Sequence, residues 1–431
     1  MVSAFSFFND QNLIFTICPI SLYMDNKKKK ERKLLFVAND QRGNQLNVAE
    51  KKWTIERLRK LRANSTFICP QCQNELDLKI GSIISAHFAH KKHSDCPSNK
   101  GGPESQYHMR GKLELYDWLQ IDENVTHVEL EPFITDIKQR PDLLISDHQQ
   151  TMAIEYQCSP IDLNILQKRS VMYKKANIPF LWILGGKLLK RTGERSFQLS
   201  QFQWRFTSKM EDGSLMIYAY CSNIKAFIIV RTIIPFSSQV VFANQSVIPK
   251  QTISFTQLIR QQSCSINFYE NWFHKVRAFR LKPFPFTTKQ ANTLNQFLYQ
   301  TKHASLLYLP SHAFLPLKYN YLIESPVYVW QGWVMTFIDE VPLNSTFSFH
   351  YIYERTKKKV KERLLSVRVL PQLNVHYSKV IYEYLEKLSE LSFITKVEYQ
   401  IYEKHQTTNW LTNIDELLNR DEELMKELKQ G

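Results

Sequence analysis

The feature that most constrains this chain is a run of cysteines and histidines between residues 69 and 96. Its spacing is C-x2-C-x14-H-x2-H-x5-C, and His93 lies inside the last interval. Two cysteines that are two residues apart can chelate one ion from a tight turn, and a distant His/Cys pair completes the tetrahedron that Zn²⁺ prefers. The segment is too small to build a large core, so we expect a bound metal to supply its stability.

More candidate ligands are present than a tetrahedral site needs. We favour Cys69, Cys72, His90 and Cys96, with His87 as the substitute histidine. A site filled in this way is structural, because it leaves no open position for chemistry. Two other interpretations stay open: a set of free thiols with surface histidines, and a redox-active cysteine pair. The second is disfavoured because no thioredoxin-like βαβ pattern surrounds the cysteines.

The overall charge of the chain indicates its kind of partner. Lys and Arg number 56 against 41 Asp and Glu, which gives a net charge of +15 and favours a polyanionic partner. Nucleic acid is the first choice and an anionic membrane surface the second. The 43% of hydrophobic and 23% of charged residues are typical of a soluble globular protein.

The location of the protein is also constrained by its sequence. The apolar stretch at 4–24 is interrupted by Asp10, and its lysines follow the apolar part, whereas a secretion signal has its positive region first. No later run is long enough to span a bilayer. The odd number of cysteines, 7, fits reduced thiols. We therefore expect a cytoplasmic protein with no membrane association, and Met24 is an alternative start.

Breaks in the pattern divide the chain, whose 431 residues predict two or three domains at roughly 150 residues each. We expect a mixed α+β and α/β fold with an extension at 1–32, a zinc-binding module at 33–100, a compact α/β unit at 101–195 and a mixed α/β region of unknown role at 196–431. In the α/β unit the pattern predicts a helix at 104–119, strands at 128–132, 140–145 and 152–158, a helix at 162–177 and a strand at 180–184. Further helices are expected at 50–63, 252–262, 378–391 and 413–429, the last with a solvated acidic face.

Acidic residues on two neighbouring strands of the α/β unit indicate a second metal site. Asp142 begins one strand, and Glu155 and Gln157 lie on one face of the next, because strand side chains alternate. A hairpin brings Asp142 beside them. Two carboxylates and the backbone carbonyl of Tyr156 or its neighbour form an all-oxygen site that suits Mg²⁺ or Mn²⁺.

The helix before these strands carries a polar stripe. Glu104, His108 and Lys112 lie one turn apart on a helix that otherwise presents leucines. The stripe can present Glu104 to the same ion. In phosphodiester hydrolysis such a metal stabilises the attacking and leaving oxygens and lowers the pKa of a bound water.

These motifs resemble a known family. Glu104 on a helix, then Arg140-Pro141-Asp142, then Glu155-Tyr156-Gln157 resemble the PD-(D/E)XK, or restriction-endonuclease-like, nucleases. With the upstream CPxC, HFAH and final cysteine, and with ESQYHMRGK, the pattern is similar to the CoiA competence proteins of Gram-positive bacteria over residues 33–190.

The resemblance implies a restriction-endonuclease-like central domain in a cytoplasmic protein that promotes recombination of incoming single-stranded DNA during natural transformation. Carried over by position, Asp142 and Glu155 are metal ligands and Glu104 is the helix carboxylate. Gln157 is a departure, since the nuclease pattern has lysine there. A lysine supplies positive charge near the attacking water, whereas an amide can only orient it.

Other interpretations of the same residues stay open. Asp142 can simply begin a strand, and Glu155 can pair with a nearby lysine. The protein can then be a nucleic-acid-binding module without turnover, or a scaffold that docks a recombination protein through its zinc module and acidic tail. The second-rank candidates for DNA contact are His108, Lys112, Arg169 and Tyr173; the last two either hold a phosphate or form a solvated surface pair.

Basic clusters interleaved with aromatic residues support a nucleic-acid partner. One example is the segment from Trp272 to Arg280, and another basic cluster lies at 355–363. Cations hold phosphates and flat rings stack unpaired bases, so single-stranded or branched DNA is the expected partner. Ordinary solvated lysines around an aromatic core are the alternative for each single cluster.

Overall fold

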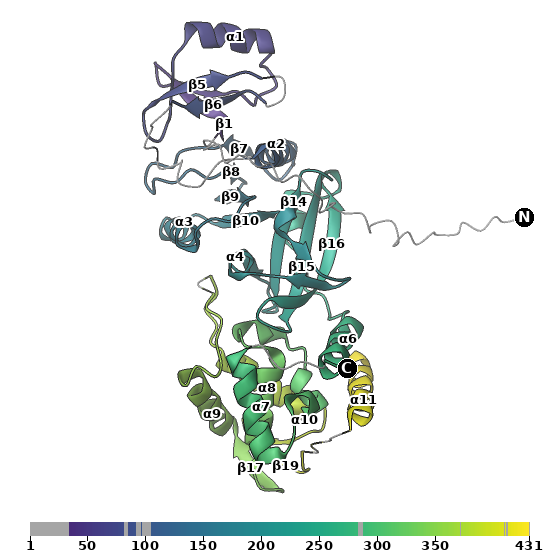
Figure 1. Cartoon of the computed structure of the whole chain (residues 1–431). Coiled ribbons are helices and arrows are strands. Elements are labelled where there is room, and N and C mark those ends of the chain that lie inside the picture. The colour runs from purple at the N-terminus through teal and green to yellow at the C-terminus, as the bar shows by residue number, and fades with distance from the viewer. Residues whose placement is uncertain are drawn as a thin grey trace, which may run out of the picture.

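The computed structural model describes residues 34–81, 85–91, 96, 105–282, 288–370, 372–408, 410 and 413–430. Figure 1 shows three parts that follow one another along a long molecule: an N-terminal module, a large sheet and a C-terminal region rich in helices. The predicted extension at 1–32 lies outside the described residues. Among the described helices, none has both the length and the apolar composition needed to cross a bilayer.

The N-terminal module is a six-stranded antiparallel sheet with one helix. Its strands lie in the order β1-β6-β5-β4-β2-β3. The turn between β2 and β3 is closed by Asp40, whose side chain accepts hydrogen bonds from two backbone N–H groups. The elements are β1 (Leu34–Leu35), β2 (Val37–Asp40), β3 (Gln45–Asn47), α1 (Ile55–Asn64), β4 (Phe67–Ile68), β5 (Glu75–Lys79) and β6 (His87–His90).

The central sheet has ten strands in the order β11-β12-β16-β15-β14-β10-β9-β8-β7, with β13 added beside β14. The β9–β10 and β10–β14 pairs are parallel and the other pairs are antiparallel. The strands are β7 (His127–Leu130), β8 (Leu143–Ser146), β9 (Thr151–Gln157), β10 (Phe180–Gly185), β11 (Lys190–Arg191), β12 (Ser196–Gln198), β13 (Thr207–Lys209), β14 (Leu215–Cys221), β15 (Ala226–Pro235) and β16 (Val240–Pro249). The sheet therefore continues past residue 195, where the sequence predicts a domain boundary.

The helices of this central part are α2 (Gln106–Gln120), α3 (Leu163–Lys175), α4 (Gln201–Trp204) and α5 (Phe255–Ile259). The predicted α2, α3, β7, β8, β9 and β10 are confirmed within a few residues. Ser105 starts α2, because its hydroxyl accepts from the His108 N–H. Gly111 lets α2 approach β9 closely: a Cβ there would lie 2.4 Å from the Tyr156 ring. The Tyr156 hydroxyl in turn donates to the Tyr220 carbonyl, 3.1 Å away, which ties β9 to β14.

The C-terminal region combines six helices with a three-stranded sheet, β17-β19-β18, in the described residues. Its elements are α6 (Tyr269–Arg280), α7 (Lys289–Lys302), α8 (Val327–Asp339), β17 (Ser345–Ser348), α9 (Phe349–Lys361), α10 (Ser378–Glu390), β18 (Thr395–Glu398), β19 (Ile401–Lys404) and α11 (Ile414–Gln430). The predicted helices at 378–391 and 413–429 are confirmed as α10 and α11; the predicted helix at 252–262 is the shorter α5. Short 3-10 turns, including η6 (Lys318–Leu322), connect α7 to α8.

Burial in this region corrects two predictions. The rings of Trp272, Phe273 and Phe279 lie in the core, so they cannot stack bases as the sequence pattern suggested. The acidic face of α11 is not wholly solvated either. Asp421 is buried and accepts from Arg280 Nε and Nη2 at 2.6 and 2.8 Å.

Candidate metal centre and nuclease-like site

Four ligand side chains of the N-terminal module converge on one point. The turn after β4 supplies Cys69 and Cys72, the end of β6 supplies His90, and the chain returns with Cys96. Their ligand atoms all lie within 4.8 Å of one another. The turn forms because the Cys69 carbonyl accepts from the Gln73 N–H at 2.9 Å. This is the favoured set of the sequence analysis, and the cluster can bind a metal ion such as Zn²⁺.

The chemistry of the cluster fits a tetrahedral metal. Thiolate sulfur and imidazole nitrogen are the ligands that Zn²⁺ takes in structural sites. A hydrogen bond with Cys96, together with burial, raises the pKa of the Cys69 thiol, a tendency that metal binding reverses by releasing the proton. The substitute histidine, His87, is not in the cluster. It lies three residues before His90 on β6, so it faces the other side of the strand, where its Nδ1 is 2.8 Å from the Ser85 carbonyl.

The predicted acidic pair is brought together at the junction of β8 and β9. Leu143 pairs with Ile154, and Asp142 directly precedes Leu143, so Asp142 lies against the next residues of β9. Its Oδ2 accepts from the Tyr156 N–H at 2.9 Å. Asp142 is 7% exposed and Glu155 only 1% exposed. The pair is thus buried, and its surroundings decide what it can bind.

Helix α3 supplies the partners of Glu155. Arg169 forms an ion pair with Glu155 Oε1, and the Tyr173 hydroxyl donates to the same oxygen at 2.6 Å. Burial alone lowers the pKa of Arg169, but Glu155, Tyr173 and Asp142 outweigh it, so this pKa lies above its ordinary value. Burial and Glu155 also raise the pKa of Tyr173, which keeps its hydroxyl protonated. Tyr173 is fully buried, so it neither contacts a phosphate nor forms a solvated surface pair with Arg169, the two alternatives that the sequence left open.

Helix α2 supplies the neighbours of Asp142. His108 Nε2 lies 3.5 Å from Asp142 Oδ2, and Lys112 Nζ lies 3.6 Å from Asp142 Oδ1. Lys112 is fully buried, so it does not present a surface to DNA as the sequence analysis proposed. Glu104, the predicted helix carboxylate, lies outside the described residues. His108 and Lys112, the described members of the predicted stripe, point into the protein at Asp142.

A buried ionic network that the sequence did not indicate lies beside the acidic pair. Glu131, which follows β7 with a φ of 50°, forms an ion pair with Lys112 and accepts from Arg140 Nη2 at 3.3 Å. Glu131 Oε2 also accepts from the Phe36 N–H at 2.9 Å, and Arg140 Nη2 donates to the Val37 carbonyl at 3.0 Å. The network thus joins the N-terminal module to the acidic pair. Arg140 stands in the quoted motif, but nothing in the sequence singles out Glu131.

Charges within the site are balanced by the protein itself. Three cationic side chains meet three carboxylates, namely Lys112, Arg140 and Arg169 against Glu131, Asp142 and Glu155. Burying charges of one sign alone would cost far more than this arrangement. The side-chain N–H of Gln157 donates to the Ser159 carbonyl at 2.6 Å. The positive charge near the pair therefore comes from α2, α3 and the turn before β8, and not from position 157.

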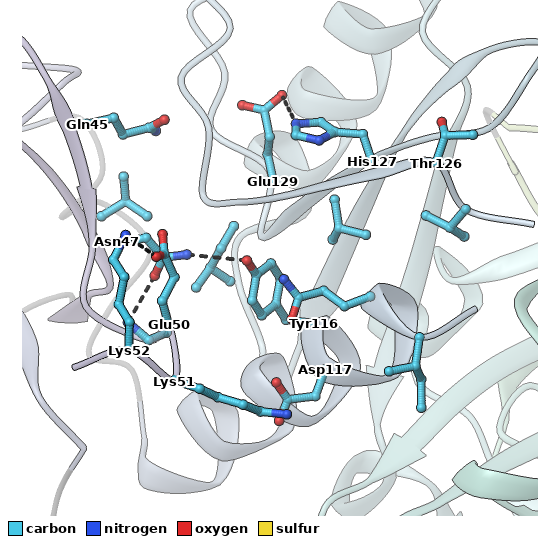
Figure 2. Close-up of a pocket in the computed structure, with 17 residues that line it drawn as sticks. Gln45, Asn47, Glu50, Lys51, Lys52, Tyr116, Asp117, Thr126, His127 and Glu129 are labelled. Atoms are coloured by element: carbon cyan, nitrogen blue, oxygen red, sulfur yellow. Dashed lines mark hydrogen bonds and ion pairs between the residues drawn. The ribbon is translucent and has the colours of Figure 1, made fainter. Parts of the chain in front are cut away.

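A polar cleft of about 850 Å³ opens between the N-terminal module and α2 and β7. Figure 2 shows its lining, where Asn47 and Tyr116 face each other across the cleft and Lys52 pairs with Glu50. His127 and Glu129 form its far wall, 3.5 Å apart. None of the predicted site residues lines this cleft. Its charges are mixed, so they favour neither an anionic nor a cationic ligand.

Comparison with known proteins gives this arrangement a family. Residues 50–99 match the N-terminal domain of competence protein CoiA, residues 104–263 its nuclease-like domain and residues 268–418 its C-terminal domain. The chain belongs to the CoiA family. A curated relative, competence protein CoiA of Bacillus subtilis (strain 168), is 29% identical over 356 residues, which cover 82% of this chain and 94% of the relative.

The CoiA domains agree with the architecture. The cysteine and histidine cluster falls in the N-terminal CoiA domain, and Asp142, Glu155 and their partners fall in the nuclease-like domain. That domain extends to residue 263 and so includes the whole ten-stranded sheet. No solved structure matches the chain.

Proposed function

We propose that this protein is a metal-dependent nuclease that acts on DNA in natural competence. Two findings support the biological role: the Bacillus subtilis relative is named a competence protein, and the middle of this chain matches a nuclease-like domain. The observation that carries the chemistry is the placement of Asp142 beside Glu155 on β8 and β9. Paired carboxylates hold Mg²⁺ or Mn²⁺ through oxygen.

In this proposal Asp142 and Glu155 are the metal ligands, and Glu104 is the third carboxylate. A divalent ion held there would lower the pKa of the attacking water and stabilise the leaving oxygen. The protein fixes the ligands beforehand. The Tyr156 N–H orients Asp142, while Arg169 and Tyr173 hold Glu155 in place until a metal binds.

The glutamine at position 157 shifts the source of positive charge. Lys112 lies 3.6 Å from Asp142 and is too buried to touch DNA, so it acts through the electrostatic potential at the metal ligands. The Arg169 side chain is 22% accessible, and its Nη2 also donates to the Arg140 carbonyl at 3.1 Å. We propose that Arg169 exchanges its Glu155 contact for a DNA phosphate once the metal neutralises Glu155.

The ion of the cysteine and histidine cluster is proposed to be Zn²⁺ in a structural role. The donor set and the near-complete burial of Cys69, His90 and Cys96 support this assignment. The metal then stabilises the sheet whose Phe36 and Val37 backbone meets Glu131 and Arg140. In this way the module supports the position of the nuclease-like site.

The proposed substrate is single-stranded or branched DNA in the cytoplasm, handed to recombination proteins. The net charge of +15 supports a polyanionic partner. A second function, DNA binding without turnover, is favoured by one observation. Gln157 replaces the lysine of the nuclease pattern, and its amide is engaged by the Ser159 carbonyl. The two functions differ in their dependence on Mg²⁺, because pure binding responds to salt instead.

Cleavage by isosteric variants tests the proposal. Labelled single-stranded, duplex and branched DNA would be incubated with the wild type, Asp142→Asn and Glu155→Gln, with Mg²⁺ or Mn²⁺ and without added divalent ion. We expect metal-dependent products that fall at least about a hundredfold in both variants, while DNA binding is retained. Asp117→Asn, an exposed carboxylate of α2, is the matched control. Tight binding without products, or products unchanged in the double variant, would overturn the nuclease assignment.

A further inference from the structure

Six rings of the C-terminal region touch one another in a continuous row. We call it the aromatic row; in spatial order it consists of Tyr399, Tyr382, Phe349, Tyr353, His376 and Tyr377. Neighbouring ring centroids lie 4.3 to 6.5 Å apart. The rings come from α9, from the start and middle of α10 and from the turn after β18, so folding gathers them from separate segments.

The aromatic row reaches solvent, unlike most rings of this region. Tyr399 is 76% exposed, His376 is exposed, and the other members are half-buried. By contrast, the rings of Trp272 and Phe279 on α6 lie in the core. The row therefore lies at the surface: Phe349, Tyr353 and Tyr377 also pack against the core, while Tyr399 and His376 are open to a flat ligand.

Cations border the aromatic row along α9. This helix carries five basic residues and one acid, Glu354. Lys357 lies over the Tyr353 ring, with its Nζ 5.5 Å from the centroid. Lys361, one turn after Lys357 on the same side of α9, is exposed and forms no salt bridge with any described carboxylate. Two acids beside the rings, Glu354 and Glu386, form ion pairs with Lys357 and Lys396, while Glu398 next to Tyr399 is exposed.

We propose that the aromatic row binds single-stranded nucleic acid. Unpaired bases stack on the rings, and the phosphates lie along Lys357 and Lys361 of α9. A duplex keeps its bases inside the stack, so it can use only the lysines. This proposal rests on the single-stranded substrate of the proposed function and adds a second contact surface for it, but the binding step does not require catalysis.

The location of the aromatic row gives the proposal a geometric consequence. In Figure 1, α9 and β17 lie at the far end of the molecule from the N-terminal module, with the strands β14 to β16 between them and β8 and β9. In this proposal a single DNA strand is therefore bound at a surface separate from the nuclease-like site. Holding and cutting can then be measured independently.

Binding of fluorescein-labelled oligothymidylate, measured by anisotropy, tests the inference in the full chain. The parent carries Asp142→Asn, so that cleavage does not disturb the measurement. In this parent, Tyr353→Leu with Tyr399→Ala removes two rings, and we expect the Kd for the single strand to rise at least about tenfold. The Kd for a duplex of equal length should change less than about twofold.

Three matched variants separate stacking from folding. Tyr353→Phe with Tyr399→Phe keeps both flat rings, so single-strand binding should be retained. Tyr299→Ala removes a ring that is 70% exposed on α7, outside the row, and should have no effect. Lys361→Gln should reduce the slope of log Kd against log salt concentration by about 0.7, because each single-strand phosphate contact contributes about that much.

The outcomes are decisive in either direction. Equal weakening of single-strand and duplex binding, or no weakening in the Leu/Ala variant, would overturn the inference. If that variant melts at a lower temperature, Tyr399→Ala alone decides, because Tyr399 is mostly exposed. If the wild type cleaves DNA but the ring variants bind single strands normally, only this inference is overturned. If single-strand binding depends on the row but the wild type does not cleave, only the nuclease proposal is overturned.

Discussion

The two candidate metal sites are both buried, yet the protein prepares them in opposite ways. In the cysteine and histidine cluster the four donors face one another, within 4.8 Å. In the nuclease-like site Asp142 already meets Lys112, and Glu155 already meets Arg169. The first arrangement needs an ion to hold its donors together, whereas the second is electrically complete without one. A metal in the cluster would therefore be part of the fold, whereas a metal at Asp142 and Glu155 must compete with protein cations.

The largest expected effect comes from removing ligands of the cluster. Cys69→Ser with Cys72→Ser should unfold the N-terminal module, because structural zinc contributes on the order of 10 kcal/mol in small domains. Limited proteolysis of residues 34–91 and zinc analysis measure this loss. Cys264→Ser, at a half-buried cysteine outside the cluster, is the control. A zinc-free protein with an intact, protease-resistant module would show that the cluster does not need a metal to stabilise the fold.

The next effect concerns the network that joins the two sites. Glu131→Gln leaves Lys112 and Arg140 as buried, poorly compensated cations, so we expect a loss of roughly 3–5 kcal/mol in the free energy of unfolding. Urea unfolding measures it. Glu129→Gln, on β7 with 40% of its side chain exposed, should change stability by less than about 0.5 kcal/mol. Equal losses in the free energy of unfolding for the two variants would show that the buried network contributes no more than an exposed glutamate.

Burial raises the pKa of a third carboxylate, Glu383, whose hydrogen-bond partners are backbone N–H groups. Glu383 on α10 accepts from the Lys318 and Tyr319 N–H groups of η6, both at 2.9 Å, and burial raises its pKa from 4.5 to about 7. Its stabilising proton is present in the folded state below pH 4.5 and is lost as the pH rises through about 7. Stability should therefore fall by roughly 3 kcal/mol over that interval.

Urea unfolding across this pH interval measures the effect of Glu383. Glu383→Gln should flatten the dependence, whereas Glu390→Gln, with 62% of its side chain exposed on the same helix, should leave it unchanged. A wild-type stability that rises with pH over the interval would contradict the assignment of a raised pKa to Glu383.

The smallest expected change is in the affinity of the nuclease-like site for Mn²⁺. Arg169→Gln removes the cation that competes for Glu155, so Mn²⁺ should bind severalfold more tightly, a gain of about 1 kcal/mol. Titration followed by electron paramagnetic resonance measures the affinity. Lys168→Gln removes an exposed charge from the same helix and serves as the control. Weaker or unchanged Mn²⁺ binding in Arg169→Gln would show that Arg169 does not compete with the metal.

Local patterns predicted most elements around the sites but not their long-range partners. The expected hairpin brings Asp142 beside Glu155, and the favoured four of the candidate cysteines and histidines are the ones that cluster. The pattern could not show that Arg169 turns inward, because an amphipathic helix does not reveal what covers its polar side. Glu131 was missed for a related reason: its contact with Phe36 joins residues 95 apart in the chain.

Burial was the second quantity that the sequence left open. The rings near Trp272 and those of the aromatic row have similar compositions, yet the first lie in the core and the second reach solvent. Only the packing of α6 against α11 and of α9 against α10 separates them. The sheet that continues past residue 195 likewise depends on the pairing of β10 with β14, which no local signal announces.

The buried pair of Arg280 and Asp421 has a consequence for how the chain is made. Arg280 also donates to the carbonyls of Leu307 and Leu309, so it sits at the centre of the C-terminal region, but its carboxylate partner follows 141 residues later. A ribosome therefore releases most of this region with a guanidinium that still lacks its counterion. Folding of the region can be completed only after α11 has left the exit tunnel.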